Sequence, residues 1–127
     1  MKIYGIGTDI ININRIKKSL KNKDFKKRLF CKNEIVKCNK QVNKDNCYAK
    51  RFAAKEAFSK AIGLGISKGL SFNEISIINN KNGKPEIKLT GKTKKIVNKI
   101  FKTKKINIYL TLSDDEPFAS ATVIISI

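Results

Sequence analysis

The stretch RFAAKEAFSKAIG, residues 51–63, decides the fold of this 127-residue chain. Small and apolar side chains recur in it at intervals of three and four residues, which predicts one buried face of an amphipathic helix. This face consists of Ala54, Ala57, Phe58, Ala61 and Ile62. We expect the helix to open at Asp45 or Asn46 and to end at Gly63, since glycine favours helix C-termini. The pattern therefore predicts a long central helix packed into the core.

Two carboxylates stand apart from other acidic residues in apolar surroundings. Glu56 lies inside the helical stretch, and Asp9 closes the segment IYGIGTDI near the N-terminus. Mg²⁺ typically takes one or two carboxylates together with phosphate oxygens, so this pair is a candidate cation site. Each acid also has a plainer interpretation. Glu56 and Lys60 are a favourable i, i+4 pair, and Asp9 precedes a predicted helix that it could cap.

The segments around the central helix predict short strands and helices. Residues 2–11 predict a buried strand, and Asn12 or Asn14 then caps a helix to about Leu20. One or two short helices are expected over 21–41, with Asn33 capping the second. The later elements are a glycine-punctuated loop over 63–71, a hairpin over 72–89, a helix from Thr90 or Gly91, and strands over 105–113 and 118–126. This order predicts one α+β domain over residues 1–127, with a largely antiparallel sheet.

The net charge of +18 comes from 28 basic and 10 acidic residues. A field of this sign attracts anions such as nucleic acids, phosphorylated cofactors or an acidic protein. Much of the excess is also explained by a biased genome, because Lys, Asn and Ile share A/T-rich codons. No apolar run approaches the roughly 20 residues needed to span a membrane, so we expect no membrane span.

The chain contains three cysteines and no histidine. A Cys/His zinc site is therefore excluded, and the commonest general base is missing. Cys31, Cys38 and Cys47 lack a CxxC spacing, and as isolated thiols they indicate a reducing compartment.

Charged residues elsewhere leave a functional and a plain interpretation open. Arg51, Lys55 and Lys60 flank Glu56 as a phosphate cradle or as a solvated basic face. The turn NGKP offers Gly83 for close backbone approach and a lysine for charge, or it is an ordinary hairpin turn. The acidic patch SDDEPF over 113–118 fits a solvated loop between strands. The basic residues between Arg15 and Arg28 form a docking surface for an acidic partner or a hydrated face.

Taken together, the motifs resemble one enzyme family. GIGTDI with Arg15 six residues after Asp9, RFAAKEAFSKAIG, NGKP, and a C-terminal S-[DH] followed by A-x-A-x-V-I are similar to holo-acyl-carrier-protein synthases, the short single-domain 4′-phosphopantetheinyl transferases. The resemblance covers essentially the whole chain in order. It implies a 4′-phosphopantetheinyl transferase-like fold and a homotrimer with active sites at subunit interfaces.

The resemblance also implies an activity and its residues. The activity is transfer of 4′-phosphopantetheine from coenzyme A to a serine of acidic apo-acyl-carrier protein, releasing 3′,5′-ADP, in support of fatty acid biosynthesis in the cytoplasm. Asp9 and Glu56 are expected to bind Mg²⁺, and Arg15 to meet the carrier protein. The residues expected around coenzyme A are Arg51, Ser59, Lys60, Asn82, Gly83, Lys84, Pro85, Ser113 and Asp114. Many family members carry histidine at the position of Asp114, which here either extends the metal shell or turns away.

The predicted mechanism needs a base other than histidine. We expect the serine proton to pass to water bound at the site or to a carboxylate, Glu56 first, while Lys60 stabilises the developing charge. Two other classes of function remain as alternatives. One is a nucleic-acid-binding module, supported by the charge but by no recognisable motif, so that we expect no nucleic-acid partner. The other is a protein-interaction domain whose metal site has decayed, suggested only by Asp114.

Overall fold

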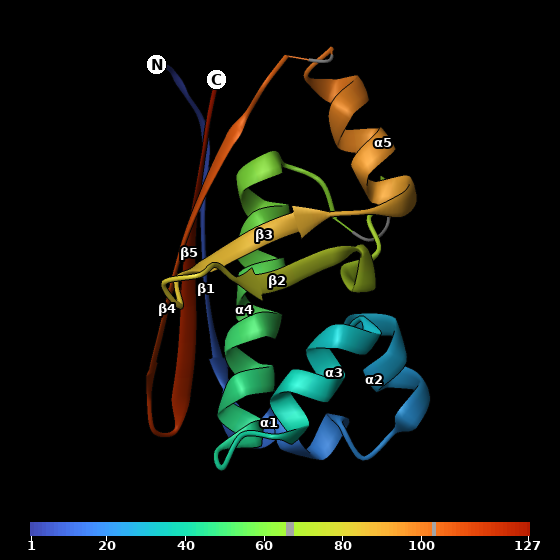
Figure 1. Cartoon of the computed structure of the whole chain (residues 1–127), viewed down its shortest axis with the longest axis vertical. Coiled ribbons are helices and arrows are strands. Elements are labelled where there is room, and N and C mark those ends of the chain that lie inside the picture. Colours follow the sequence, from blue (N-terminus) through green and yellow to red (C-terminus); the bar gives the residue numbers. More distant parts are fainter. Residues whose placement is uncertain (66–67, 103) are drawn as a thin grey trace.

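The computed structural model describes residues 1–65, 68–102 and 104–127. A long helix, α4, lies beside a long antiparallel sheet, a short hairpin crosses that helix, and three small helices gather at one end (Figure 1). The elements in order are β1 (Ile3–Asn12), α1 (Ile13–Ser19), α2 (Lys23–Leu29), α3 (Lys32–Asn39), α4 (Lys44–Ile62), the 3-10 turn η2 (Phe72–Glu74), β2 (Ile75–Asn79), β3 (Pro85–Leu89), α5 (Gly91–Ile100), β4 (Asn107–Asp115) and β5 (Phe118–Ser126). The predicted α+β class is confirmed.

The long sheet has the order β1-β5-β4, and every pairing in it is antiparallel. The pairing of β1 with the central strand β5 brings the two chain ends together, and Lys2 and Ile127 exchange two backbone hydrogen bonds of 2.8 Å there. The hairpin β2–β3 forms a second, two-stranded antiparallel sheet. The predicted antiparallel pairing is confirmed, and it is divided between two sheets.

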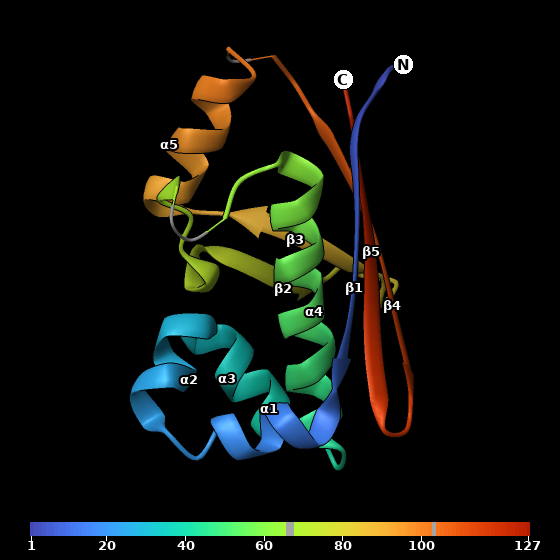
Figure 2. The same ribbon diagram turned by 180° about the vertical axis from the view of Figure 1, so that it is seen from behind.

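Strand β1 lies directly on α4, as the view from behind shows (Figure 2). Two glycines permit this approach, because a Cβ on Gly5 would come within 1.9 Å of the Ala61 carbonyl oxygen and one on Gly7 within 1.9 Å of the Ala57 oxygen. The opposite face of β1 is open, and Ile6 and Ile10 are 61% and 66% exposed. The prediction that this strand is buried is thus right for one face only.

Helix α4 has the predicted buried face. All five residues of the stripe are buried, and Gly63 ends the helix in the left-handed conformation at φ 83°, with its N–H donated to the Ser59 oxygen. The helix opens two or three residues earlier than predicted, at Asn43, which occupies the N-cap position. Nineteen helical residues therefore form the central element of the core.

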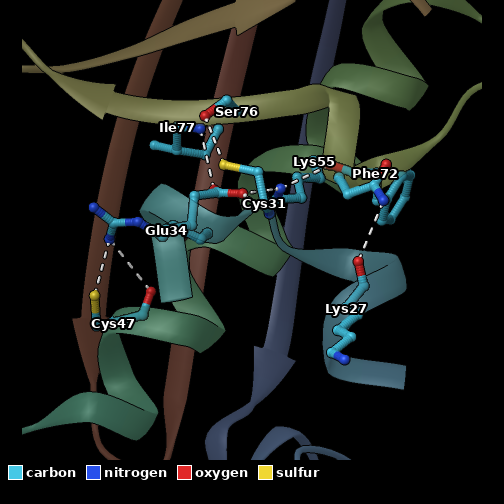
Figure 3. Close-up of polar contacts among 10 residues, drawn as sticks. Lys27, Cys31, Glu34, Cys47, Lys55, Phe72, Ser76 and Ile77 are labelled. Atoms are coloured by element: carbon cyan, nitrogen blue, oxygen red, sulfur yellow. Dashed lines mark hydrogen bonds and ion pairs between the residues drawn. The ribbon is translucent and has the colours of Figure 1, made fainter. Parts of the chain in front are cut away.

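A buried ion pair fastens α4 to its neighbours (Figure 3). Lys55 Nζ donates to Glu34 Oε1 at 2.6 Å and to the Phe72 carbonyl at 2.7 Å. Glu34 also accepts from the backbone N–H groups of Cys31 and Ile77, both at 3.1 Å. The expectation that Lys55 belongs to a solvated basic face or a phosphate cradle is wrong, because its side chain is fully buried and its charge is used inside the fold.

The smaller elements agree with the sequence predictions in some details and differ from them in others. Asn12 caps α1 as expected, with its side chain accepting from Asn14 N–H at 2.9 Å. Cys31 rather than Asn33 precedes α3, because the Glu34 side chain closes a capping box there. Strand β4 continues through Asp115, so the first two acids of the SDDEPF patch lie on a strand instead of in a loop. The expected loop over 63–71 includes residues 66 and 67, which lie outside the described residues.

The expectation of three isolated thiols is also wrong. Cys38, near the end of α3, and Cys47, in the first turn of α4, form a disulfide, and Cys31 is the free cysteine among the described residues. The turn between the two helices brings these cysteines together despite a separation of nine residues. The disulfide therefore removes the reason to expect a reducing compartment. Within the described part of the chain, no helix is long and apolar enough to cross a membrane.

Candidate active site

The contact of β1 with α4 carries Asp9 to the middle of the helix. Side chains alternate along a strand, so Asp9 shares the helix-facing side of β1 with Gly5 and Gly7. Lys60 Nζ donates to Asp9 Oδ1 at 3.2 Å and to the Thr8 carbonyl at 2.9 Å. Residues 51 positions apart in the sequence thus meet at one site.

Glu56 lies in the same site and interacts with the charges of both Asp9 and Lys60. Burial raises the pKa of its half-buried carboxyl, the Asp9 carboxylate raises it further, and Lys60 opposes both effects. The two carboxylates repel each other and are only partly exposed to water. A cation bound beside them would therefore be stabilised.

The atoms at this site that could bind a metal ion are carboxylate oxygens. Among the described residues no group of three or more His, Cys, Asp or Glu side chains is arranged to hold a metal ion. A site with two carboxylates suits Mg²⁺, which takes one or two protein carboxylates and completes its shell with water and phosphate oxygens. It does not suit a metal that needs a full cage of protein ligands.

Arg51 lines a hollow of about 420 Å³ on the side of α4 that faces β2 and the α3–α4 turn. The Arg51 side chain is 6% exposed, and burial lowers its pKa. Its Nη1 atom lies 3.1 Å from Cys47 Sγ, and its Nη2 atom donates to Asn79 Oδ1 at 3.3 Å. The Nε atom is buried without a hydrogen-bond partner among the described residues. The positive charge of the guanidinium favours binding of an anion in the hollow.

The NGKP turn is built around Asn80. Its side-chain oxygen accepts from the N–H groups of Asn82 at 2.9 Å and Lys84 at 3.0 Å. Gly83 adopts φ 83°, which favours glycine, and its carbonyl accepts from Asn79 Nδ2 at 2.8 Å. Because Asn79 also bonds Arg51, the turn is linked to the arginine hollow. Pro85 begins β3 directly after it.

The other residues predicted for the site have positions or hydrogen-bond partners away from the acid pair. Ser59 is buried and donates its hydroxyl to the Lys55 carbonyl at 3.1 Å. Ser113 is an exposed residue of β4. Asp114 accepts from Asn46 at 2.9 Å and pairs with Lys50 at 3.4 Å, both on α4. Arg15 is exposed on α1.

Several residues of the hollow were not singled out from the sequence. They are Lys37, Asn46, Lys50 and Asn79, which line it together with Arg51 and Asp114. Lysine and asparagine are abundant in this chain, so no local pattern marks these few. Their common location depends on how α3, α4 and β2 pack.

Comparison with known proteins identifies the family of this chain. Residues 5–115 match the model of the ACPS 4′-phosphopantetheinyl transferase superfamily. The holo-[acyl-carrier-protein] synthase of Pelagibacter ubique is 52% identical over 125 residues, covering 98% of both chains. The chain belongs to the holo-acyl-carrier-protein synthase family. This family consists of enzymes, as the sequence motifs had predicted.

Solved holo-acyl-carrier-protein synthases share the fold. The crystal structure from Neisseria meningitidis matches with a TM-score of 0.84 at 35% identity, covering 98% of this chain and 99% of that one. The structure from Bacillus anthracis, in complex with CoA (3′,5′-ADP), matches with a TM-score of 0.78 at 35% identity, covering 98% of this chain and 97% of that one. The predicted 4′-phosphopantetheinyl transferase-like fold is thereby confirmed.

Proposed function

We propose that this chain transfers 4′-phosphopantetheine from coenzyme A to a serine of apo-acyl-carrier protein and releases 3′,5′-ADP. The observation that carries the proposal is the meeting of Asp9, Glu56 and Lys60 on one side of α4. Two relatives support the substrate classes, because both are holo-[acyl-carrier-protein] synthases and one was solved with CoA. By the same family likeness, we assign the reaction to fatty acid biosynthesis and the protein to the cytoplasm.

The chemistry assigned to the chain is a displacement at phosphorus. The serine oxygen forms a bond to the β-phosphorus of coenzyme A, and the bond from that phosphorus to the bridging oxygen breaks, with 3′,5′-ADP leaving. Glu56 is assigned as the acceptor of the serine proton, because its carboxylate lies at the site and the chain contains no histidine. Lys60, already held by Asp9 and the Thr8 carbonyl, is fixed in place to stabilise negative charge on the phosphate oxygens.

Asp9 and Glu56 are the residues that would hold Mg²⁺. The fit rests on two carboxylates close enough for one to raise the pKa of the other, and within the described parts of the chain no third acid joins them in a metal-binding group. When bound, Mg²⁺ neutralises phosphate charge and orients the leaving group. Without it, Lys60 provides the opposite charge next to Asp9.

The 3′-phosphate of coenzyme A, which lies outside the reacting diphosphate, is assigned to the hollow around Arg51 and to the adjacent NGKP turn. Arg51 offers a guanidinium that is largely shielded from water and lines the hollow. Lys84 and the backbone of Asn82, Gly83 and Pro85 border the nucleotide in this proposal. Ser59 has a smaller part, since its hydroxyl hydrogen is already donated to the backbone.

An acidic carrier protein suits the charge of the chain. Arg15 and its neighbours on α1 and α2 are mostly exposed, and they follow β1, the strand that carries Asp9. Such a surface speeds association with an acidic protein, and the effect fades with salt. We therefore expect the rate of association with apo-carrier protein to fall with ionic strength, and an unchanged rate would contradict this docking surface.

A homotrimer is part of the proposal. The outer face of the long sheet carries a row of Ile6, Ile124 and Tyr109 in direct register across its three strands. Ile6 is 61% and Tyr109 is 46% exposed, and an open apolar face of this kind marks an association surface. We expect sedimentation to give a trimer and Ile6→Glu to dissociate it. A monomeric wild-type chain would contradict the assembly.

Intact-mass spectrometry tests the activity. Apo-carrier protein incubated with this chain, coenzyme A and Mg²⁺ is expected to gain one phosphopantetheine arm. No gain, with coenzyme A still bound in an Mg²⁺-independent way, would favour the interaction domain with a decayed site. Binding to RNA in preference to apo-carrier protein at matched salt would favour the nucleic-acid module.

A further inference from the structure

The hollow beside Arg51 contains a carboxylate where an anion-binding site would be expected to have none. Asp114, from the end of β4, lies at its rim together with the cationic side chains of Lys37, Lys50 and Arg51. A bare carboxylate would repel a phosphate in this place. The contacts of Asp114 therefore decide whether it opposes or supports anion binding.

The two carboxylate oxygens of Asp114 contact two residues on one face of α4. Its Oδ2 atom accepts from Asn46 Nδ2 at 2.9 Å, and its Oδ1 atom lies 3.4 Å from Lys50 Nζ. Asn46 and Lys50 are four residues apart on α4, so they lie one above the other on the helix surface. Asn46 Nδ2 also donates to Glu116 Oε1 at 3.0 Å, which ties the β4–β5 connection to the same helix.

The geometry restrains Lys50. A free lysine side chain loses rotamer freedom when it is fixed by a ligand. Lys50 is already held at the rim, with 30% of its side chain exposed, so part of that freedom is lost before a ligand arrives. Its three N–H donors exceed what one contact to Asp114 uses, which leaves donors for a phosphate oxygen.

We propose that Lys50 is a phosphate-binding residue of this hollow and that Asp114, supported by Asn46, is the residue that positions it there. The ligand group is a phosphate of coenzyme A, so the inference rests on the proposed function. The described residues that line the hollow include three cations, Lys37, Lys50 and Arg51, and one acid, Asp114. Their net charge of +2 matches the opposite charge of a phosphate monoester.

Asp114→Asn is expected to change the affinity for coenzyme A in opposite directions under the two interpretations of Asp114. If Asp114 positions Lys50, Asp114→Asn weakens coenzyme A binding about threefold, and Lys50→Ala weakens it about tenfold, in the range of a hydrogen bond to a charged group. The double variant is then no weaker than Lys50→Ala, and Lys50→Arg keeps affinity within about twofold. If Asp114 only repels phosphate, Asp114→Asn tightens binding.

The experiment is calorimetric titration of the full chain with coenzyme A, with KM and kcat measured on the same variants. Asp115→Asn is the matched control for loss of an acid on β4, and Lys44→Ala for loss of a lysine on α4; both are expected to bind coenzyme A as wild type does. We expect KM to rise and kcat to change little for Lys50→Ala, with unfolding temperatures unchanged. Tighter binding by Asp114→Asn, or unchanged binding by Lys50→Ala, would overturn the inference. Failure of the wild type to bind coenzyme A would overturn the proposed function instead.

Discussion

Two charged clusters on α4 differ in their access to water. Lys55 and Glu34 are 0% and 1% exposed at their side chains, and backbone groups complete their hydrogen bonds. Lys60 and Asp9 are 55% and 17% exposed, and the neighbouring Glu56 has a raised pKa. Adjacent residues of one helix, Lys55 and Glu56, thus belong to opposite kinds of site. The buried ion pair of Lys55 and Glu34 stabilises the fold, whereas the partly exposed carboxylates of Asp9 and Glu56 are available to bind a cation.

The largest effect is expected from Glu56→Gln. This change keeps the shape of the side chain but removes a cation ligand and the proton acceptor, so transfer should fall by at least about 10³-fold, since a bound cation contributes several kcal/mol. The unfolding curve should stay close to wild type. Asp115→Asn, at an exposed acid on β4, is the control and should keep its activity. Wild-type rates in Glu56→Gln would remove the assigned role.

The buried cluster should respond in the opposite way. Glu34→Ala leaves Lys55 uncompensated in the core and should lower the free energy of unfolding by about 3–5 kcal/mol. Combining Leu at position 34 with Met at position 55 should recover much of that loss, because no charge is left buried. Denaturant unfolding measures both variants. Equal stability of Glu34→Ala and wild type would show that the buried pair does not hold α4.

The disulfide is expected to give a smaller change. Cys47→Ser opens a short loop between α3 and α4, and loop-closure entropy predicts a loss of about 2–3 kcal/mol in oxidised protein. Cys31→Ser, at the free cysteine, is the control and should lose less. Alkylation of unreduced protein followed by mass spectrometry should label one cysteine per chain. Labelling of all three without reductant would contradict the disulfide.

The smallest effect is expected in the pH dependence of Mg²⁺ stabilisation. A carboxyl whose folded pKa is raised contributes stability at low pH and loses it as pH rises through that pKa, so ionised Glu56 destabilises the cation-free fold. Mg²⁺ binds the ionised form, and its stabilising effect should therefore grow between about pH 4 and pH 7. Thermal unfolding with and without Mg²⁺ measures it. Asp9→Asn should abolish the Mg²⁺ shift, and a shift independent of pH would contradict the assignment.

The sequence allowed much of the central architecture to be predicted. The spacing of small residues identified the buried face of α4, and Gly63 identified its end, because both depend on local geometry. The isolated acids Asp9 and Glu56 were visible as exceptions in a basic chain. The glycines of GIGTD allow β1 to approach α4 closely, which brings these acids together.

Other features could not be predicted because they depend on packing between distant segments. Lys55 looked like one more surface lysine, and only the approach of Glu34 and Phe72 shows that it is buried. The Cys38–Cys47 disulfide depends on the turn between α3 and α4, not on a recognisable spacing. Lys50 gains its partner from β4, more than 60 residues later in the chain.

The most direct test of the account is to locate the cation. Crystals of the chain grown with coenzyme A and Mn²⁺ in place of Mg²⁺ would reveal the ion by its anomalous scattering. The account predicts a peak bounded by the carboxylates of Asp9 and Glu56 and by phosphate oxygens, and no peak there in Glu56→Gln. A peak at another place, or full phosphopantetheine transfer with no ion at these two carboxylates, would contradict it.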